Sequence, residues 1–160
     1  MPPSAAPTAG CDPARSSRFA FRADAWRGLV RHCESDYPRE ACGALLAAPA
    51  LDRDLVTRTE PLRNVASDPL RAFEAEPAAV YSLLRFERRG AFRVLGFYHS
   101  HPDANPDPST RDLALAWPAY WHLIATVRAG RCTETWVGRS APNGPPAVAA
   151  SGDERAPRRG

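Results

Sequence analysis

Two histidines and an aspartate within one short stretch are the residue types best suited to chemistry in this 160-residue chain. His99 and His101 stand one residue apart, and Asp112 follows on the next predicted element. Two imidazoles and one carboxylate leave a fourth coordination position open, which is the ligand count of a catalytic rather than a structural zinc site. The stretch therefore predicts a metal centre with His99, His101 and Asp112 as ligands.

The same residues also allow an ordinary structural interpretation. A histidine at the end of a strand is commonly a satisfied polar residue, and Ser109 with Asp112 has the spacing of a capping box at the start of a helix. A capping box would commit Asp112 to the backbone and leave no carboxylate for a metal. The spacing within this stretch does not separate the two interpretations.

The elements around the stretch explain how the side chains could meet. Residues 92–98 form an apolar run rich in β-branched and aromatic types, which predicts a buried strand. Alternate residues of an extended chain point to the same face, so His99 and His101 would project together. Ser109 begins a short predicted helix, and Asp112 in its first turn can reach back toward the histidines.

A resemblance to a known family favours the metal site. The pattern His99-Ser100-His101, seven residues, Ser109, two residues, Asp112 resembles the signature of the JAB1/MPN/Mov34 (JAMM) metalloproteases. That family also has an upstream glutamate in a Pro-x-Glu-x-Cys-Gly setting, and this chain has Pro38-Arg39-Glu40-Ala41-Cys42-Gly43. The resemblance covers roughly residues 18 to 140 and is nearest to the short stand-alone bacterial members.

The resemblance implies a fold and a role for each residue. The expected fold is α/β, a single domain with a mixed β-sheet flanked by helices, of the cytidine-deaminase-like MPN/JAB type. His99, His101 and Asp112 would hold Zn²⁺ with water as the fourth ligand. Glu40 would be the general base without ligating the metal, and Ser109 would donate a hydrogen bond to the developing oxyanion.

The implied activity is hydrolysis of the peptide or isopeptide bond after the C-terminal Gly-Gly of a ubiquitin-like protein. A sulfur-carrier protein is the expected partner in bacteria. The extended segments 44–48 and 55–62, close to Glu40, are where such a tail could add as a strand. Three alternatives stay open: a deubiquitinase-like enzyme, a defence-associated JAMM hydrolase of another substrate, and a catalytically inactive MPN scaffold.

Composition limits the other classes of function. Hydrophobic residues at 44% and charged residues at 24% are typical of a globular domain. A formal net charge of +3 is too small to indicate nucleic-acid binding, and there is no apolar stretch long enough for a membrane span. Oligomeric state and the identity of the leaving group are left open by the sequence.

The termini and the cysteines predict a domain with two tails in a reducing compartment. Residues 1–17 and 141–160 are rich in Pro, Ala and Gly, so both are expected to be disordered around a domain at 18–140. Residues 1–17 lack the apolar core of a signal peptide, and the four cysteines show no Cys-x-x-Cys spacing. We therefore expect a cytoplasmic protein with reduced thiols.

Hydrophobic periodicity and turn residues predict the remaining elements. The expected strands are residues 19–22, 41–48, 55–62, 92–98, 121–127 and 132–137, and the expected helices begin near Asp24, Pro77 and Ser109. Cys42 is interpreted as a small packed core residue rather than part of the metal site. Trp117, Trp121 and Trp136 are interpreted as packing residues rather than as surfaces for substrate.

Overall fold

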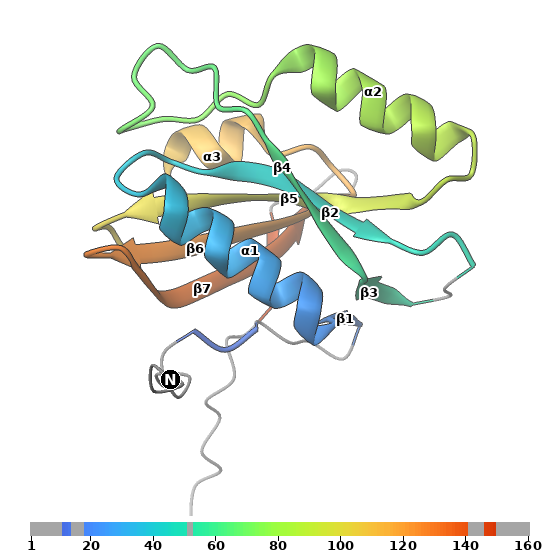
Figure 1. The fold of residues 1–160 in the computed structure, drawn as a ribbon, viewed down its shortest axis with the longest axis horizontal. Coiled ribbons are helices and arrows are strands. Elements are labelled where there is room, and N and C mark those ends of the chain that lie inside the picture. The colour runs from blue at the N-terminus through green and yellow to red at the C-terminus, as the bar shows by residue number, and fades with distance from the viewer. Residues whose placement is uncertain (1–10, 14–17, 51–52, 141–145, 150–160) are drawn as a thin grey trace, which may run out of the picture.

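The computed structural model of this chain describes residues 11–13, 18–50, 53–140 and 146–149. Its elements are, in chain order, β1 (Phe19–Phe21), α1 (Ala23–Asp36), β2 (Cys42–Ala47), β3 (Asp54–Val56), β4 (Arg58–Leu62), α2 (Pro77–Arg88), β5 (Arg93–Pro102), α3 (Thr110–Leu115), β6 (Trp121–Arg128), β7 (Arg131–Ser140) and β8 (Pro146–Ala149). The fold is α/β, with a mixed sheet flanked by helices, which confirms the predicted fold class (Figure 1).

The six-stranded sheet places the histidine-bearing strand near its centre. The strand order is β4-β2-β5-β6-β7-β8, and all neighbouring pairs are antiparallel except β5 and β6. Because β5 and β6 are parallel, the chain must cross over between them, and α3 lies in that connection. The connection that carries Asp112 therefore begins where the histidines end.

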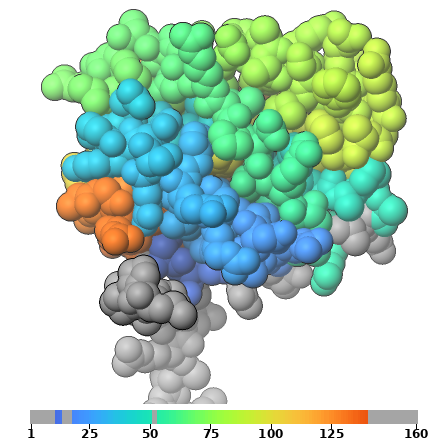
Figure 2. Space-filling view, viewed as in Figure 1, coloured from blue at the N-terminus to red at the C-terminus, as the bar shows by residue number. Residues whose placement is uncertain are grey.

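Helix α1 covers one face of this sheet. Its buried side chains Trp26, Leu29 and Cys33 recur at helical spacing and pack with sheet residues such as Leu45 and Leu123. In Figure 1 α1 crosses in front of the sheet, and in Figure 2 its side chains fill that surface. The helix begins at Ala23, so the prediction of an N-cap at residue 24 is wrong by two residues.

Helix α2 packs on the opposite face, which explains why β2 is apolar along its whole length. Alternate residues of β2 belong to the two cores: Leu45 packs with α1, whereas Ala44 and Leu46 pack with Leu83 of α2. A strand buried on both faces has no polar side to show in the sequence. The predicted strand at 41–48 is confirmed within one or two residues.

The predicted strand at 55–62 is two strands. β4 pairs with β2 in the large sheet, whereas β3 pairs in parallel with β1 in a separate two-stranded sheet. Between them, the Thr57 amide donates to the Leu46 carbonyl oxygen (2.8 Å). One polar-alternating run in the sequence therefore belongs to two sheets, which its periodicity does not reveal.

Each of the two segments predicted as disordered tails contains described residues with structure that composition did not predict. β8 (Pro146–Ala149) pairs with β7, so the sheet continues past the domain boundary predicted at residue 140. Cys11 forms a disulfide with Cys132, and the Trp26 indole donates to the Cys11 carbonyl oxygen (3.1 Å). The prediction of reduced thiols is thus wrong for these two cysteines. The rest of the predicted tails, residues 1–10, 14–17, 141–145 and 150–160, lies outside the described residues.

Two further features of the chain bear on the sequence predictions. Cys33 and Cys42 are free and buried. Among the described residues, there is no helix of the length and apolar character needed to cross a membrane.

Candidate metal centre

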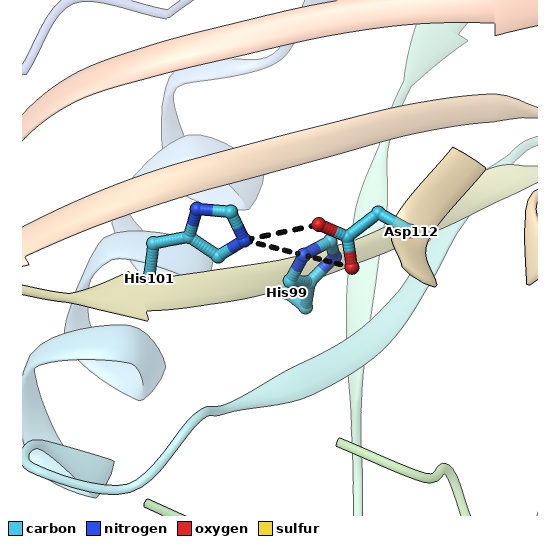
Figure 3. Close-up of side chains that lie close together, drawn as sticks. All are labelled: His99, His101 and Asp112. Atoms are coloured by element: carbon cyan, nitrogen blue, oxygen red, sulfur yellow. Dashed lines mark hydrogen bonds and ion pairs between the residues drawn. The ribbon is translucent and has the colours of Figure 1, made fainter. Parts of the chain in front are cut away.

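Strand β5 presents the two histidines on one face of the sheet. The strand runs to Pro102 and so includes His99 and His101, which project together as the extended backbone predicts. Asp112 approaches them from the first turn of α3 (Figure 3). The structure thereby brings together the three residues that the sequence predicts as metal ligands.

The three polar ends converge to within hydrogen-bonding distance of one another. The Nε2 atoms of His99 and His101 are 3.1 Å apart. Each of them lies 3.2 Å from one carboxylate oxygen of Asp112, with Oδ1 next to His99 and Oδ2 next to His101. Three ligand atoms of suitable chemistry so close together are compatible with a metal site.

Asp112 also completes the capping box that the sequence allowed as an alternative. The Ser109 amide donates to Asp112 Oδ2 (2.7 Å), and the Asp112 amide donates to Ser109 Oγ (3.1 Å). The capping-box interpretation is therefore confirmed, and the cap leaves Asp112 facing the histidines, so it does not exclude the metal interpretation. One carboxylate caps α3 and faces the histidines, because each of its oxygens has more than one acceptor lone pair.

Two contacts that the sequence did not predict orient the imidazoles. His101 Nδ1 lies 2.8 Å from the Asn105 carbonyl oxygen, which fixes a proton on Nδ1 and leaves Nε2 to face Asp112. The ring of His99 stacks on Phe73, with centroids 4.3 Å apart. Phe73 lies in a loop far from β5 in sequence, and no local pattern marks it.

The backbone of Glu40 is held beside β5 by hydrogen bonds on several sides. Ser100, between the two histidines, points to the other face and accepts from the Ala41 amide through Oγ (2.8 Å). The Glu40 amide donates to the Pro69 carbonyl oxygen (2.7 Å), and the Asn64 side-chain amide donates to the Glu40 carbonyl oxygen (2.9 Å). Ser100 and Asn64 thus position a residue predicted as catalytic, and neither was singled out from the sequence.

Glu40 and Ser109 line one hollow together with His101 and Asp112. This hollow, which we call the polar cleft, has a volume of about 330 Å³ and its walls come from the end of β5, the start of α3 and the loop around residues 70–73. His99 does not line this hollow but lines the neighbouring one, together with Asp112. The carboxylate predicted as a base, the Ser109 hydroxyl and two of the three candidate ligands, His101 and Asp112, therefore share one cavity.

Burial shifts the pKa values of the polar groups in different directions. It raises the pKa of the Glu40 carboxyl to about 7 and lowers that of His99. Burial by itself would lower the pKa of His101, but hydrogen bonds to Asp112 and to the Asn105 carbonyl raise it above its ordinary value. Burial opposes the ionisation of Asp112 as well, yet the hydrogen bonds from His101, His99 and Ser109 hold its pKa well below the usual range. Asp112 is therefore an anion, as a ligand must be.

The prediction that Cys42 is a packed core residue is confirmed, whereas the prediction that residues 44–48 could pair with a substrate tail is wrong. Cys42 is buried in the core and burial raises the pKa of its thiol to about 12, so it packs as predicted. β2 lies between β4 and β5, so residues 44–47 have no free edge and cannot pair with a substrate tail. Among the described strands, β4 is the outer one on that side of the sheet.

Comparisons with known proteins identify a matching family and several similar chains. The family described as "Prokaryotic homologs of the JAB domain" matches residues 22–138. A desampylase of Haloferax volcanii is 36% identical over 77% of this chain and 91% of its own. A probable TtuB-protein conjugate cleaving protease of Thermus thermophilus is 37% identical over 62% of this chain and 68% of its own. A CysO-cysteine peptidase of Mycobacterium tuberculosis is 31% identical over 68% of this chain and 73% of its own.

Solved structures share the fold. A protein of Desulfitobacterium hafniense superimposes with a TM-score of 0.66 at 25% identity, covering 81% of this chain and 88% of its own. A protein of Salinibacter ruber gives a TM-score of 0.59 at 26% identity, covering 89% of this chain and 97% of its own. The arrangement of sheet and helices is thus found in other solved structures.

Proposed function

Because this chain belongs to the family of prokaryotic homologs of the JAB domain, we propose that it is a zinc-dependent peptidase acting on conjugates of a ubiquitin-like protein. The bond cleaved is the peptide or isopeptide bond after a C-terminal Gly-Gly, and a sulfur-carrier protein is the expected partner. The names of the relatives support hydrolysis of this kind, since they include a desampylase, a conjugate-cleaving protease and a peptidase. The observation that carries the proposal is the meeting of His99, His101 and Asp112 beside Glu40.

The spacing of the three candidate ligands fits a zinc ion. Tetrahedral ligands at about 2.0–2.1 Å from zinc lie about 3.3 Å from one another. The two Nε2 atoms are 3.1 Å apart, and each lies 3.2 Å from a different carboxylate oxygen of Asp112. These distances are close to that spacing, and the set of two imidazoles and one carboxylate suits zinc. When bound, zinc supplies Lewis-acid activation of a water molecule and of the scissile carbonyl.

Glu40 is proposed as the general base. Its carboxylate lines the polar cleft and can take the proton of the attacking water, then pass it to the leaving nitrogen. A pKa raised by burial makes Glu40 a stronger base than an exposed glutamate, which suits this task at neutral pH. Zinc next to the carboxylate would lower this pKa again, so Glu40 would be ionised in the loaded enzyme.

Ser109 is proposed to stabilise the oxyanion that develops on the substrate carbonyl. Its Oγ accepts a hydrogen bond from the Asp112 amide, so the hydroxyl proton remains free to be donated. Loss of one such donor commonly lowers kcat by about 100- to 1000-fold. The cap fixes the hydroxyl at the rim of the cleft, where it requires little reorganisation during the reaction.

The experiment that tests the proposal compares metal content with cleavage in the same variants. The substrate is a ubiquitin-like carrier ending in Gly-Gly with a short peptide extension. We expect about one zinc per chain in the wild-type protein and in Glu40→Gln, with cleavage lowered at least about 100-fold in Glu40→Gln. His99→Ala should lose the zinc and the cleavage together. Glu60→Gln is the matched control and should change neither, because Glu60 lies on β4, its side chain is 44% exposed and it pairs with Arg58.

Three results would contradict parts of the proposal. Full zinc in His99→Ala would place the ligands elsewhere, and loss of zinc in Glu40→Gln would make Glu40 a ligand. A zinc-loaded wild-type protein that cleaves no conjugate would instead identify an inactive scaffold.

A further inference from the structure

A second and larger hollow adjoins the metal centre on its other side. This hollow, which we call the apolar pocket, has a volume of about 610 Å³ and lies between α2, α3 and the strands β5 to β7. That volume is within the range of pockets that bury a small organic ligand. Its walls are mainly aromatic and aliphatic, and they include Tyr81, Phe97, Leu113, Leu115, Trp117 and Trp136.

Exposed apolar side chains gather around this pocket. The described part of the chain has seven large hydrophobic residues that are exposed, and four of them line the apolar pocket: Tyr81, Leu113, Leu115 and Trp117. Trp117 is 44% exposed and rests edge-on against Phe97 inside the pocket. Clustered exposed apolar surface marks a place where another molecule binds. Trp117 and Trp136 thus line a cavity, whereas Trp121 is buried in the core as predicted.

The apolar pocket adjoins the polar cleft. Phe73, Arg111 and Asp112 line both hollows, so they lie where the two meet. His99 faces the apolar pocket, and Glu40 faces the polar cleft. The metal centre therefore lies at the boundary between an apolar and a polar compartment.

The position of Glu40 decides which part of the substrate enters which compartment. In the proposed mechanism Glu40 gives a proton to the leaving nitrogen, so the leaving group lies in the polar cleft. The acyl part of the substrate must then extend the other way, past Asp112 and His99, into the apolar pocket. Because each residue of an extended chain spans about 3.3 Å, two glycines carry the chain about 7 Å from the scissile bond.

From this arrangement we infer that the apolar pocket binds a bulky apolar side chain of the carrier's tail, at the position directly before the two glycines. This inference rests on the proposed function and adds a specificity determinant to it. Trp117 and Leu115 are the specificity-determining residues. A glycine pair alone would leave the exposed apolar side chains around the pocket without contacts.

Equilibrium binding tests the inference without depending on catalysis. The probes are fluorescent tail peptides that end in Leu-Gly-Gly, Ala-Gly-Gly or Asp-Gly-Gly, and the protein is the zinc-loaded wild type. Burial of a leucine side chain predicts about 10- to 100-fold tighter binding of the leucine peptide than of the alanine peptide. The aspartate peptide should bind more weakly still. Equal binding of the leucine and alanine peptides would overturn the inference.

Variants connect the preference to the pocket. Trp117→Ala and Leu115→Ala should each reduce the preference for leucine over alanine to a few-fold, and both side chains are exposed enough for the fold to tolerate their loss. Phe86→Ala is the matched control, because Phe86 is similarly exposed but lines neither hollow. An unchanged preference for leucine over alanine in both pocket variants would overturn the inference. Self-association of the wild type that Trp117→Ala abolishes would also overturn it, since a second copy of the chain would then occupy the pocket.

Cleavage of the matching carrier conjugates separates this inference from the proposed function. If the leucine conjugate is cleaved with a higher kcat/KM than the alanine conjugate, and the difference comes from a lower KM, both the proposed function and the pocket assignment stand. If no conjugate is cleaved but the leucine peptide still binds more tightly, the proposed function fails and the pocket assignment stands. If all conjugates are cleaved at equal kcat/KM, the proposed function stands and the pocket assignment fails.

Discussion

Asp112 shows how a single side chain can have two structural roles. Its carboxylate accepts a hydrogen bond from the Ser109 amide at the start of α3 and also faces His99 and His101. An ordinary capping box needs no histidines, and a metal ligand needs no cap. Because the cap holds the carboxylate in an orientation that faces the histidines, binding of the proposed metal would have less entropy to remove.

Glu40 gives a prediction about stability in the metal-free protein. Burial raises the pKa of its carboxyl from 4.5 to about 7, so ionisation is less favourable in the folded than in the unfolded state. The free energy of unfolding should therefore fall as pH rises from about 4.5 to 7, by at most about 3 kcal/mol and by less where solvent screens the carboxylate. Glu40→Gln should lack this loss and be more stable than the wild type at pH 8, although not at pH 4.

Chemical denaturation in the presence of a chelator measures this difference. Glu60→Gln, on the surface of β4, serves as the control and should follow the wild-type pH dependence. Parallel curves for Glu40→Gln and the wild type would show that Glu40 is not buried enough to resist ionisation. Adding zinc should remove the difference, since a nearby cation favours the charged carboxylate.

At the scale of elements, α3 depends on its cap. It has six residues, none of which is buried, and so short a helix is marginal by itself. Ser109→Ala should lower the free energy of unfolding by about 1 kcal/mol, whereas Ser109→Gly should lower it by only a few tenths, because glycine is an acceptable N-cap. Both variants lack the hydroxyl proposed to stabilise the oxyanion.

The pair of Ser109 variants therefore separates capping from catalysis. Cleavage should fall to a similar extent in both, and denaturant midpoints should differ between them. If cleavage followed stability across the pair, the rate loss would come from disorder of α3 rather than from the missing hydroxyl. Ser109→Thr retains a capping hydroxyl and should stay near wild type in stability.

The elements also show what could be predicted from the sequence. The strands that carry the site follow from apolar runs, since β2 and β5 bury side chains on both faces of the sheet. The meeting of His99, His101 and Asp112 was predictable because they are local to one strand and the helix after it. Phe73, Asn64 and the walls of the apolar pocket were not, since their contacts join segments distant in sequence. Composition also misled, because β8 is a strand formed from a Pro-rich and Ala-rich segment.

At the scale of the whole molecule, the disulfide joins an N-terminal segment to β7. Cys11 and Cys132 are separated by 121 residues in sequence, and their Cα atoms are 5.7 Å apart. This bond also removes one of the two observations behind the expected cytoplasmic location, because not all the cysteines are free.

Reduction of this bond should destabilise the protein. Closing a long loop restricts the unfolded chain, and loss of a native disulfide typically costs about 2–5 kcal/mol. Cys11→Ser should unfold at a lower denaturant concentration than the oxidised wild type, and dithiothreitol should bring the wild type to the level of the variant without affecting Cys11→Ser. Thiol titration of the unfolded, unreduced wild type should find the two free cysteines, Cys33 and Cys42. Four reactive thiols there would show that the disulfide is absent.

The long covalent loop closed by Cys11 and Cys132 has a consequence for limited proteolysis. The loop contains Glu40, Asp112 and the two candidate ligand histidines, His99 and His101. A single protease cut anywhere between the two cysteines therefore leaves two fragments that stay bonded together, and all the candidate catalytic side chains stay on one covalent species. On a gel without reductant such a nicked protein should migrate as one band near the intact mass, and with reductant it should separate into two. Activity lost on nicking could then be assigned to the position of the cut, because no part of the site would have been released.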